Sequence, residues 1–393
     1  MGITKRDRLL DLTRLISRAG RPMTGVDRVE FAYLTHLLDA GPLWGLVRSS
    51  LGYVLLDQRG CAALRALVIL QNWGAADRLS WLRRGMDPVR ARAEADLRRL
   101  CLDRCLPMRL PAMLRRHLPR GITYVNTGHT NLTDRVISAL GHIDASITVF
   151  IHDTIPLDVP QYQRPGTVER FRHFLMRAAR ADLLVCNSHQ TETDLARHLG
   201  DGLPKTASAP LGLDLMQPGT APAGPWRAPY FVTLGTIEPR KNHALLLDLW
   251  QDNPDADLLI CGSRGWENKA VFDRLDTRPP RVHELPGLDD GQVAALLADS
   301  AGMLFPSFAE GYGLPPVEAA ALGVPVLVND LPIYREVLGD IPVYADVTDR
   351  YRWRNEISRM AADHRTGQAR AEQAPRFSPP TWEAHFKTVL TLT

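Results

Sequence analysis

Two carboxylates eight residues apart, Glu310 and Glu318, flank a glycine-rich turn in the stretch LFPSFAEGYGLPPVEAAALGVPVLV. The apolar run 303–305 predicts a buried strand, and Pro315 and Pro316 suit the first turn of a helix, where a missing N–H costs little. Such a junction directs backbone N–H groups and the positive end of a helix at one point, which suits a phosphate. Because carboxylates repel phosphate, we expect both glutamates to bind hydroxyl groups beside it. A polyhydroxylated molecule that carries a phosphate is a nucleotide sugar.

The wider string E-G-Y-G-L-P-x-x-E-A-x-A-x-G-x-P-V resembles the E-x7-E signature of glycosyltransferase family 4, whose members are retaining enzymes of the GT-B fold. The resemblance lies in the whole string, since a glycine-containing turn with solvated glutamates occurs in many doubly wound proteins. It implies that Glu318 binds ribose hydroxyls, that Glu310 binds the donor sugar, and that nearby backbone amides bind the phosphates. The donor-site residues that it implies between the two glutamates are Gly311, Tyr312, Gly313 and Leu314.

A basic loop, G-T-I-E-P-R-K-N-H, follows a predicted strand that ends at Leu234. Arg240 and Lys241 there could stabilise the negative charge that develops on a diphosphate leaving group. The alternative is a solvated surface loop. The loop resembles the family's G-R-x-x-x-x-K motif, with Gly235 and Lys241 at matching positions, but Thr236 stands where the family has arginine. Arg240 is then the residue that could supply the second charge.

The segment I-H-D-T-I-P follows a predicted strand ending at residue 150, and its histidine resembles one that family members place beside the donor sugar. His152 could hydrogen-bond a sugar hydroxyl or carry a proton near neutral pH. The alternative is that His152 caps a loop and that Asp153 begins the next turn.

Other predicted site residues rest on weaker patterns. Gly262 and Arg264, in G-S-R-G-W, follow a strand and could lie near the nucleotide, although Arg264 could equally be a surface residue. We assign six residues near strand or helix ends to the acceptor or phosphate side of the site: Thr24, Gly25, Asn126, Gly128, His129 and Asp153.

No metal or further cofactor is expected. Asp255 and Asp257 spell D-x-D, the metal motif of the unrelated GT-A fold, but they lie in a turn before a strand and the rest of that fold is missing. No cluster of His, Cys and Asp has the spacing of metal ligands. We therefore expect metal-independent catalysis with a nucleotide sugar as co-substrate.

Two doubly wound α/β domains are needed to position these residues. Strands are predicted at 9–15, 123–126, 146–151 and 183–186, with a helix at 27–38. Such alternation is typical of a parallel sheet with helices on both faces. Residues 211–229 are rich in Pro and Gly and predict a linker.

After this linker, the alternation resumes with strands at 230–234, 258–261 and 324–328 and a helix at 244–250. The resemblance implies a GT-B layout with a cleft between the domains. The expected organisation is an acceptor-binding domain at 1–212, a nucleotide-sugar-binding domain at 213–375, and a helix at 382–392, within 376–393, that crosses back to the first domain.

The bulk composition of the 393 residues is that of a globular protein, with 45% hydrophobic and 23% charged residues. The net charge of +3 is too small to indicate a nucleic-acid partner. Five scattered cysteines fit a reducing compartment, and neither a signal peptide nor an apolar run of 18 residues is present. The sequence therefore predicts a cytoplasmic protein, soluble or peripheral on the inner face of the membrane.

Residues 78–120 hold twelve arginines against four acidic residues, with apolar residues at roughly helical spacing. A basic amphipathic segment can dock on anionic lipid headgroups. The alternative is a solvated helical hairpin. The apolar residues of this pattern are Trp81, Leu97, Leu100, Leu110 and Leu114.

The function that follows is retaining hexosyl transfer in bacterial surface-polysaccharide synthesis. H-D-x-I-P-L, E-P-R-K-N-H and G-x-R-G-W together resemble bacterial mannosyltransferases, which favours GDP-mannose as donor; a UDP- or dTDP-hexose is the alternative. The acceptor would be a lipid-linked oligosaccharide or a growing polysaccharide. Two other classes stay open: a nucleotide-sugar epimerase on the same fold, and a non-catalytic subunit that binds nucleotide sugars.

Overall fold

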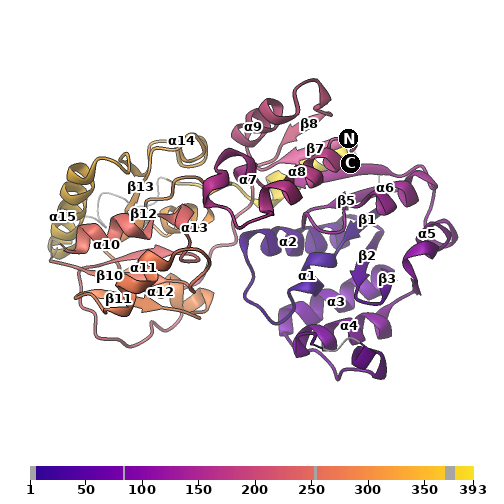
Figure 1. Cartoon of the computed structure of the whole chain (residues 1–393), viewed down its shortest axis with the longest axis horizontal. Coiled ribbons are helices and arrows are strands. Elements are labelled where there is room, and N and C mark those ends of the chain that lie inside the picture. Colours follow the sequence, from indigo (N-terminus) through magenta and orange to yellow (C-terminus); the bar gives the residue numbers. More distant parts are fainter. Residues whose placement is uncertain (1–5, 83–84, 252–254, 368–376) are drawn as a thin grey trace.

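Two α/β domains, each built around one sheet, make up the computed structural model of this protein (Figure 1). The structure describes residues 6–82, 85–251, 255–367 and 377–393. The predicted fold class, two doubly wound domains, is confirmed. The predicted domain boundary at residues 375 and 376 lies outside the described part of the chain.

The N-terminal domain holds an eight-stranded sheet in the order β4-β3-β2-β1-β5-β6-β7-β8. The pairs β2–β3 and β3–β4 are antiparallel, and all the other neighbours are parallel. The chain therefore runs outward from β1 to β4 and then returns to the other side of β1. The strands are β1 (Arg8–Asp11), β2 (Leu43–Ser49), β3 (Gly52–Leu56), β4 (Asp103–Cys105), β5 (Thr123–Asn126), β6 (Ser146–Ile151), β7 (Leu183–Cys186) and β8 (Thr206–Ser208).

Helices cover both faces of this sheet because alternate strand residues face opposite sides. Leu10 packs in one buried cluster with α1 to α4, and Leu9 packs in another with α5, α6, α8 and α9. The helices are α1 (Thr13–Ser17), α2 (Gly25–Ala40), α3 (Gln58–Leu70), α4 (Pro88–Leu100), α5 (Leu110–His117), α6 (Asp134–Gly141), α7 (Ile155–Asp158), α8 (Thr167–Ala178) and α9 (His189–Leu199), with 3-10 turns η1 (Arg78–Leu82), η2 (Pro107–Arg109), η3 (Pro160–Tyr162) and η4 (Gly200–Gly202).

The first strand is shorter than predicted. The expected strand at 9–15 ends at Asp11, and α1 begins at Thr13. The Asp11 carboxylate accepts the Thr13 N–H at 3.0 Å, and the buried Glu30 carboxylate accepts the Leu15 N–H at 2.9 Å. These two side chains bind the backbone donors that a longer strand would have paired, so an apolar run that looked like one strand becomes a strand and a short helix.

The C-terminal domain holds a six-stranded, fully parallel sheet in the order β11-β10-β9-β12-β13-β14. Here the chain runs from β9 outward to β11 and returns to β12 on the other side of β9. The strands are β9 (Tyr230–Leu234), β10 (Asp257–Cys261), β11 (Val282–Leu285), β12 (Gly302–Phe305), β13 (Val326–Val328) and β14 (Val343–Tyr344). The helices are η5 (Pro239–Lys241), α10 (His243–Gln251), α11 (Lys269–Asp276), α12 (Asp290–Asp299), α13 (Leu314–Ala321), α14 (Pro332–Leu338) and α15 (Arg350–Thr366).

The last helix, α17 (Trp382–Leu392), crosses back and packs on the N-terminal domain. The Phe386 ring lies 4.9 Å from the Tyr33 ring of α2, and the His385 Nε2 lies 3.0 Å from the Tyr33 hydroxyl. Trp382 covers Gly212 so closely that a Cβ at Gly212 would collide with it. The helix therefore joins the N-terminal domain to the linker at 211–229, which forms no helix or strand.

The basic segment 78–120 is not a helical hairpin. It forms η1, α4, the edge strand β4, η2 and α5, and Arg83 and Arg84 lie outside the described residues. The apolar side chains of Leu97, Leu110 and Leu114 are fully buried in the core. This apolar face packs inside the protein and is not available to a bilayer.

Candidate functional site

The predicted donor residues meet where the C-terminal sheet changes direction. β9 and β12 are neighbours in the sheet, and the chain leaves them toward opposite edges. Ligands of doubly wound sheets bind at the carboxyl ends of strands at such a switch point. The loop after β9 carries Arg240 and Lys241, and the loop after β12 carries Glu310. The Phe308 N–H donates to the Arg240 carbonyl at 2.9 Å, so the two loops are tied together.

Four charged side chains form a compact cluster at this point, the Arg-Lys-Glu cluster of Glu238, Arg240, Lys241 and Glu310. One carboxylate oxygen of Glu310 lies 2.6 Å from the Lys241 Nζ and 2.9 Å from an Arg240 Nη. The other Arg240 Nη lies 2.6 Å from Glu238. The Lys241 ammonium also lies 4.3 Å from the centre of the Phe305 ring, in cation–π geometry.

The pKa values of the side chains in the cluster reflect two opposing effects, burial and ion pairing. Burial alone would raise the pKa of Glu310, but Arg240 and Lys241 hold that pKa below its usual value. Burial would lower the pKa of Arg240, yet the Glu310 and Glu238 carboxylates raise it. Burial lowers the pKa of Lys241, and Glu310 opposes this shift. Two cations thus face two carboxylates, and the cluster carries no net charge.

The glycine-rich turn before α13 has one clear conformational requirement. Gly313 is the N-cap of α13 with φ +83°, and a Cβ there would lie 2.5 Å from the Tyr334 ring. Only glycine fits both constraints. Pro315 and Pro316 have no N–H, so Leu314 carries the one backbone donor among the first three residues of the helix. The N-terminus of α13 therefore offers few backbone N–H groups to a phosphate, and a phosphate bound there would also need cations nearby.

Glu318 lies one turn into α13, and its side chain is 5% exposed. Burial raises its pKa, although the guanidinium of Arg28 opposes this. Arg28 comes from α2 of the other domain, and its Nη1 lies 2.7 Å from the Glu318 carboxylate. The sequence patterns pointed to Thr24 and Gly25 at the start of this helix but not to Arg28.

His152 and Asp153 follow β6 and face the glycine turn of the C-terminal domain. A Cβ at Gly311 would lie 2.9 Å from both the His152 carbonyl and the Asp153 carboxylate, so the domains touch here. The Asn187 amide donates to the carbonyls of His152 at 2.7 Å and Gly311 at 3.2 Å. Asn187 was also missed, although a polar residue directly after a strand, here β7, is the same signal that pointed to His152.

Burial lowers the pKa of His152 to about 4, although its Nε2 lies 2.7 Å from the Thr127 carbonyl, a contact that acts the other way. The lowered pKa favours the neutral imidazole at physiological pH. Burial raises the pKa of Asp153 to about 6, and Arg240 opposes the shift.

The residues predicted for the acceptor side lie at the switch point of the N-terminal sheet, between β1 and β5. The Asn126 amide donates to the Tyr124 hydroxyl at 3.0 Å and to the Thr130 carbonyl at 2.8 Å. Gly128 packs against Glu30, and a Cβ there would collide with the carboxylate. His129 has φ +55°, and its Nε2 lies 2.8 Å from the Phe150 carbonyl.

The start of α2 brings Thr24 and Gly25 toward the C-terminal domain. Thr24 forms a capping box with Asp27, which also pairs with Arg14 and Arg18. A Cβ at Gly25 would lie 3.2 Å from the Leu314 side chain. The N-termini of α2 and α13 therefore face each other across the domain interface.

Other predicted donor residues are less closely joined to the cluster. Gly235 lies beside Lys241, and Gly262 packs on Gly235. Arg264 forms ion pairs of 2.8 Å with both Asp276 and Glu284 at the edge of the sheet.

The side chains of two further predicted donor residues, Tyr312 and Thr236, contact neighbouring loops. Tyr312 is buried and its hydroxyl donates to the Leu211 carbonyl at 3.2 Å, which ties the glycine turn to the linker. The methyl of Thr236 packs near Gly265, and Arg240 brings a guanidinium to Glu310 instead. The structure thus joins Lys241, Arg240 and Glu310 directly and leaves the roles of the outer residues as predictions.

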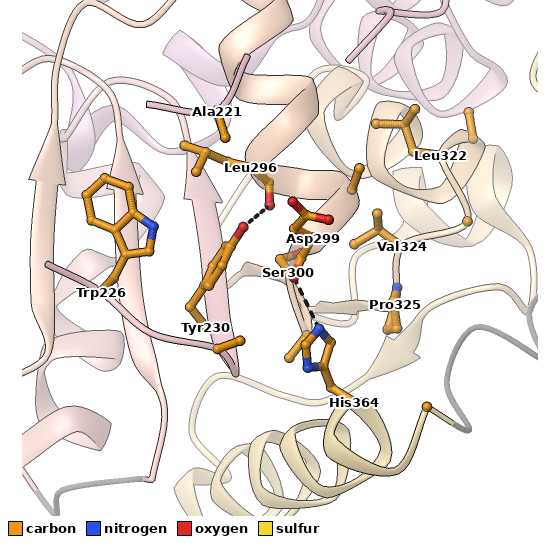
Figure 2. Close-up of a pocket in the computed structure, with 16 residues that line it drawn as sticks. Ala221, Trp226, Tyr230, Leu296, Asp299, Ser300, Leu322, Val324, Pro325 and His364 are labelled. Atoms are coloured by element: carbon orange, nitrogen blue, oxygen red, sulfur yellow. Dashed lines mark hydrogen bonds between the residues drawn. The ribbon is translucent and has the colours of Figure 1, made fainter. Parts of the chain in front are cut away.

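A cavity of about 1000 Å³ lies at the other end of the C-terminal sheet (Figure 2). Tyr230, the first residue of β9, lines it, and the Tyr230 hydroxyl donates to the Leu296 carbonyl at 3.0 Å. Pro325, just before β13, lines it as well. Because these are the amino ends of the strands, the cavity is separate from the Arg-Lys-Glu cluster at their carboxyl ends. Among the residues that the structure describes, no group of three or more His, Cys, Asp or Glu side chains could hold a metal ion.

Residues 224–369 match the family model described as Glycosyl transferases group 1. The chain is 31% identical over 213 residues to the serotype-specific mannosyltransferase WbdA of Escherichia coli, in a match that covers 48% of this chain and 26% of that protein. It is 35% identical over 127 residues to the O-antigen chain mannosyltransferase B of Escherichia coli, over 30% of this chain and 33% of that protein. These matches span only about a quarter to a third of each curated relative.

The whole fold is that of GT-B glycosyltransferases. The structure of Anabaena Alr3699/HepE in complex with UDP-glucose superposes with a TM-score of 0.62 at 16% identity, over 98% of this chain and 99% of that one. Sucrose-phosphate synthase from Thermosynechococcus elongatus gives a TM-score of 0.61 at 15% identity, over 99% and 97% of the two chains.

Proposed function

We propose that this protein is a glycosyltransferase that transfers a hexose from a nucleotide sugar to a lipid-linked or polysaccharide acceptor. The observation that carries the proposal is the Arg-Lys-Glu cluster at the switch point of a domain that matches the group 1 family. The relatives named as mannosyltransferases favour mannose, with GDP-mannose as the first donor to test. A UDP- or dTDP-hexose is the alternative.

The proposed donor pose follows from the charges. The diphosphate takes the Leu314 N–H together with Lys241 and Arg240, which lie against Glu310 in the structure. Their transfer to the diphosphate frees the Glu310 oxygens to accept hydroxyls of the donor sugar, while Glu318 accepts the ribose hydroxyls. As the glycosidic bond breaks, the same two cations stabilise the negative charge on the leaving diphosphate. This scheme needs no metal ion.

We also propose that the transfer retains the configuration of the anomeric carbon of the sugar. In the structure the Glu310 carboxylate is bound by Lys241 at 2.6 Å and by Arg240 at 2.9 Å, and the proposed pose commits its oxygens to hydroxyls of the donor sugar and not to the anomeric carbon. We therefore favour attack of the acceptor from the face that the diphosphate leaves, with the leaving phosphate taking the acceptor proton. The neutral His152 then serves as a hydrogen-bonding group beside the donor sugar.

Hydrolysis and transfer assayed across GDP-, UDP- and dTDP-sugars test the proposal. We expect turnover with one donor, and Glu310→Gln should lower it by a factor on the order of 100 to 1000 in protein that is folded at the assay temperature. The melting temperature, measured alongside, should fall because Lys241 and Arg240 lose a buried partner. Glu356→Gln, which removes a carboxylate paired with Arg359 on α15 of the same domain, is the control. Near-native turnover of Glu310→Gln would refute the assigned role. Interconversion of donors without an acceptor would indicate an epimerase, and binding without turnover a non-catalytic subunit.

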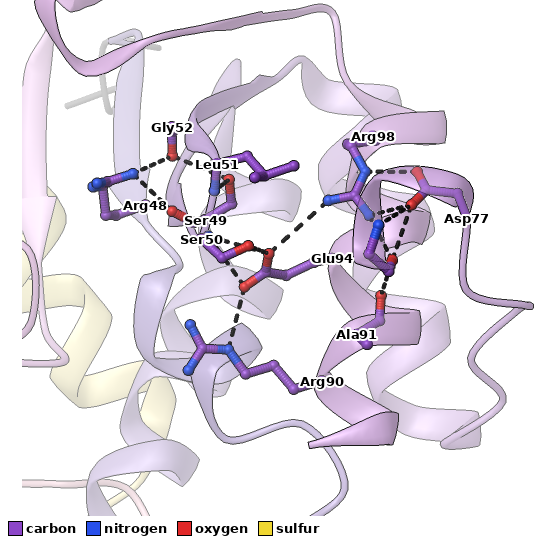
Figure 3. A network of polar contacts seen from close by, with 11 residues as sticks. Arg48, Ser49, Ser50, Leu51, Gly52, Asp77, Arg90, Ala91, Glu94 and Arg98 are labelled. Carbon is purple, nitrogen blue, oxygen red and sulfur yellow. Dashed lines mark hydrogen bonds and ion pairs between the residues drawn. The ribbon is translucent and has the colours of Figure 1, made fainter. Parts of the chain in front are cut away.

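We also propose that this protein contacts anionic membrane through a smaller surface than the whole basic segment. The arginines of α4 are bound internally: Arg98 pairs with Asp77 at 2.6 Å, and Arg90 pairs with Glu94 at 3.2 Å (Figure 3). Arg99 pairs with Asp96 at 2.6 Å. Because these guanidinium groups already pair with carboxylates of the protein, they contribute little to binding anionic lipid headgroups.

The surface that remains lies around β4 and η2. Exposure alternates along 101–108, leaving Leu102, Leu106 and Met108 exposed by 43%, 62% and 82%. Within the described chain, Arg104, Arg109 and Arg115 form no ion pair with a carboxylate. Exposed apolar side chains beside unpaired arginines suit an anionic bilayer. No helix in the described residues is long and apolar enough to cross one.

A further inference from the structure

Arg28 reaches from the N-terminal domain into the predicted ribose site of the C-terminal domain. Its Nη1 lies 2.7 Å from Glu318 on α13, and its Nη2 lies 2.8 Å from Asp290 at the start of α12. The side chain is 33% exposed, so the guanidinium is neither sealed in the core nor free in solvent. These two ion pairs join three helices across the domain interface.

Residues at the start of α2 determine where the Arg28 side chain lies. The Thr24–Asp27 capping box sets the start of α2, and Gly25 lets that start approach Leu314 closely. Asp27 is already engaged by Arg14 and Arg18. Arg28, one turn into the helix, is therefore directed toward the carboxylates of the other domain.

The charge around the donor site is unfavourable for a diphosphate without Arg28. Lys241 and Arg240 are balanced by Glu310 and Glu238, so the Arg-Lys-Glu cluster has no net charge. Glu318 and Asp290 add two negative charges nearby, and Arg28 is the cation that both of them contact. Removing this guanidinium would leave two uncompensated carboxylates near the place where a diphosphate must bind.

We propose that Arg28 is a donor-binding residue that the N-terminal domain contributes to the nucleotide site. In the structure its guanidinium pairs with Glu318 and Asp290; when ribose hydroxyls occupy Glu318, the guanidinium keeps Asp290 and turns to the donor diphosphate. The planar fork of arginine suits two parallel hydrogen bonds to phosphate oxygens. This inference rests on the proposed function, because it takes Glu318 as the ribose-binding residue.

Binding of GDP, UDP and dTDP, measured by titration calorimetry, identifies the preferred nucleotide, and inorganic pyrophosphate is then tested as a competitive inhibitor. Arg28→Ala should weaken both the preferred nucleoside diphosphate and pyrophosphate by roughly 10- to 100-fold, the loss of a charge-assisted hydrogen-bonded pair. Binding of the matching nucleoside, which has no phosphate, should change less than threefold. Arg28→Lys should retain part of the affinity, and Asp290→Asn, which removes the other partner of Arg28, should leave it within a few-fold.

The same substitution in a protein that already carries Glu318→Gln distinguishes two explanations. Arg28 either contacts the phosphate directly or only neutralises the Glu318 carboxylate. With Glu318→Gln present, Arg28→Ala should still weaken pyrophosphate. If Arg28→Ala leaves nucleotide affinity unchanged or tightens it, or if the pyrophosphate effect disappears with Glu318→Gln, Arg28 only shields Glu318 and the inference is wrong. Failure of the wild-type protein to bind any nucleotide or turn over any nucleotide sugar would instead refute the proposed function.

Discussion

Asp153 is subject to two opposing influences at the contact between the domains. Burial, together with the nearby Glu310 and Asp158, raises its pKa to about 6, while Arg240 and the Ile155 N–H lower it. A carboxyl with an unfolded pKa near 3.9 that titrates near 6 in the folded protein is held in an environment that disfavours its charge. Such a residue costs stability at neutral pH, which is typical of a site kept for function.

Asp153→Asn should therefore stabilise the protein in a pH-dependent way. Because the folded-state pKa is raised, the contribution of Asp153 to stability is fully present below pH 4 and is lost as the pH rises through 6. Relative to wild type, the variant's free energy of unfolding should rise between pH 4 and pH 7.5 by on the order of 2–3 kcal/mol. Urea unfolding at both pH values measures this, with Asp144→Asn, at an exposed aspartate of the same domain, as the control. A pH-independent difference would contradict the assignment.

The residues that sequence could identify share one property, a place next to a recognisable local pattern. Lys241, Glu310 and His152 each follow a predicted strand, and the structure places all three near the domain contact. Arg28 could not be found in this way. Its partner Glu318 lies 290 residues further along the chain, and only the packing of two domains brings them together.

At the scale of elements, buried strands were the most predictable part of the fold. The bounds predicted for β5, β6, β7 and β9 are those of the structure, because short apolar runs between polar residues have few other ways to be buried. The edge strand β4 and its neighbour β3 were not predicted. Both pair in antiparallel fashion; β4 has no apolar run of its own, whereas β3 is an apolar, fully buried run, and this signal was missed.

The turn between β12 and α13 leads to an element-scale prediction. Gly311→Ala would place a Cβ 2.9 Å from the His152 carbonyl and the Asp153 carboxylate, so one domain must shift against the other. We expect transfer activity to fall by about tenfold or more, because the domains shift against each other and Gly311 is itself a predicted donor residue. Gly141→Ala, at a glycine with open space around its α carbon, is the control. Wild-type turnover of Gly311→Ala would show that the contact does not matter.

At the scale of the whole molecule, two sheets turn their switch points toward each other. The contact between them is held at several places, including the start of α9, where the His189 and Gln190 N–H groups donate to Glu336 of the other domain at 2.7 and 2.9 Å. A helix that is capped by a carboxylate from another domain loses that cap when the domains separate. Separating the two domains would therefore break the Arg28 ion pairs and the Glu336 hydrogen bonds, and each loss costs free energy.

The surface around β4 and η2 allows a vesicle experiment. The double variant Arg109→Glu/Arg115→Glu should bind phosphatidylglycerol vesicles at least tenfold more weakly than wild type, since each basic residue near such a surface contributes about 1 kcal/mol. Met108→Asp should weaken binding as well. Cosedimentation measures both effects, with phosphatidylcholine vesicles and Tyr351→Asp, at an exposed tyrosine of the other domain, as controls. Equal binding of wild type and the double variant would exclude this surface.

The return of α17 has a practical consequence for engineering. Because the chain passes between the domains twice, once in 211–229 and again between residues 367 and 382, a donor domain cannot be exchanged at a single junction. A chimera made only at the linker would bring a foreign last helix to Tyr33 and Gly212, where Phe386 and Trp382 pack now. Chimeras designed to change donor specificity should keep α17 with its own N-terminal domain and place the second junction before it.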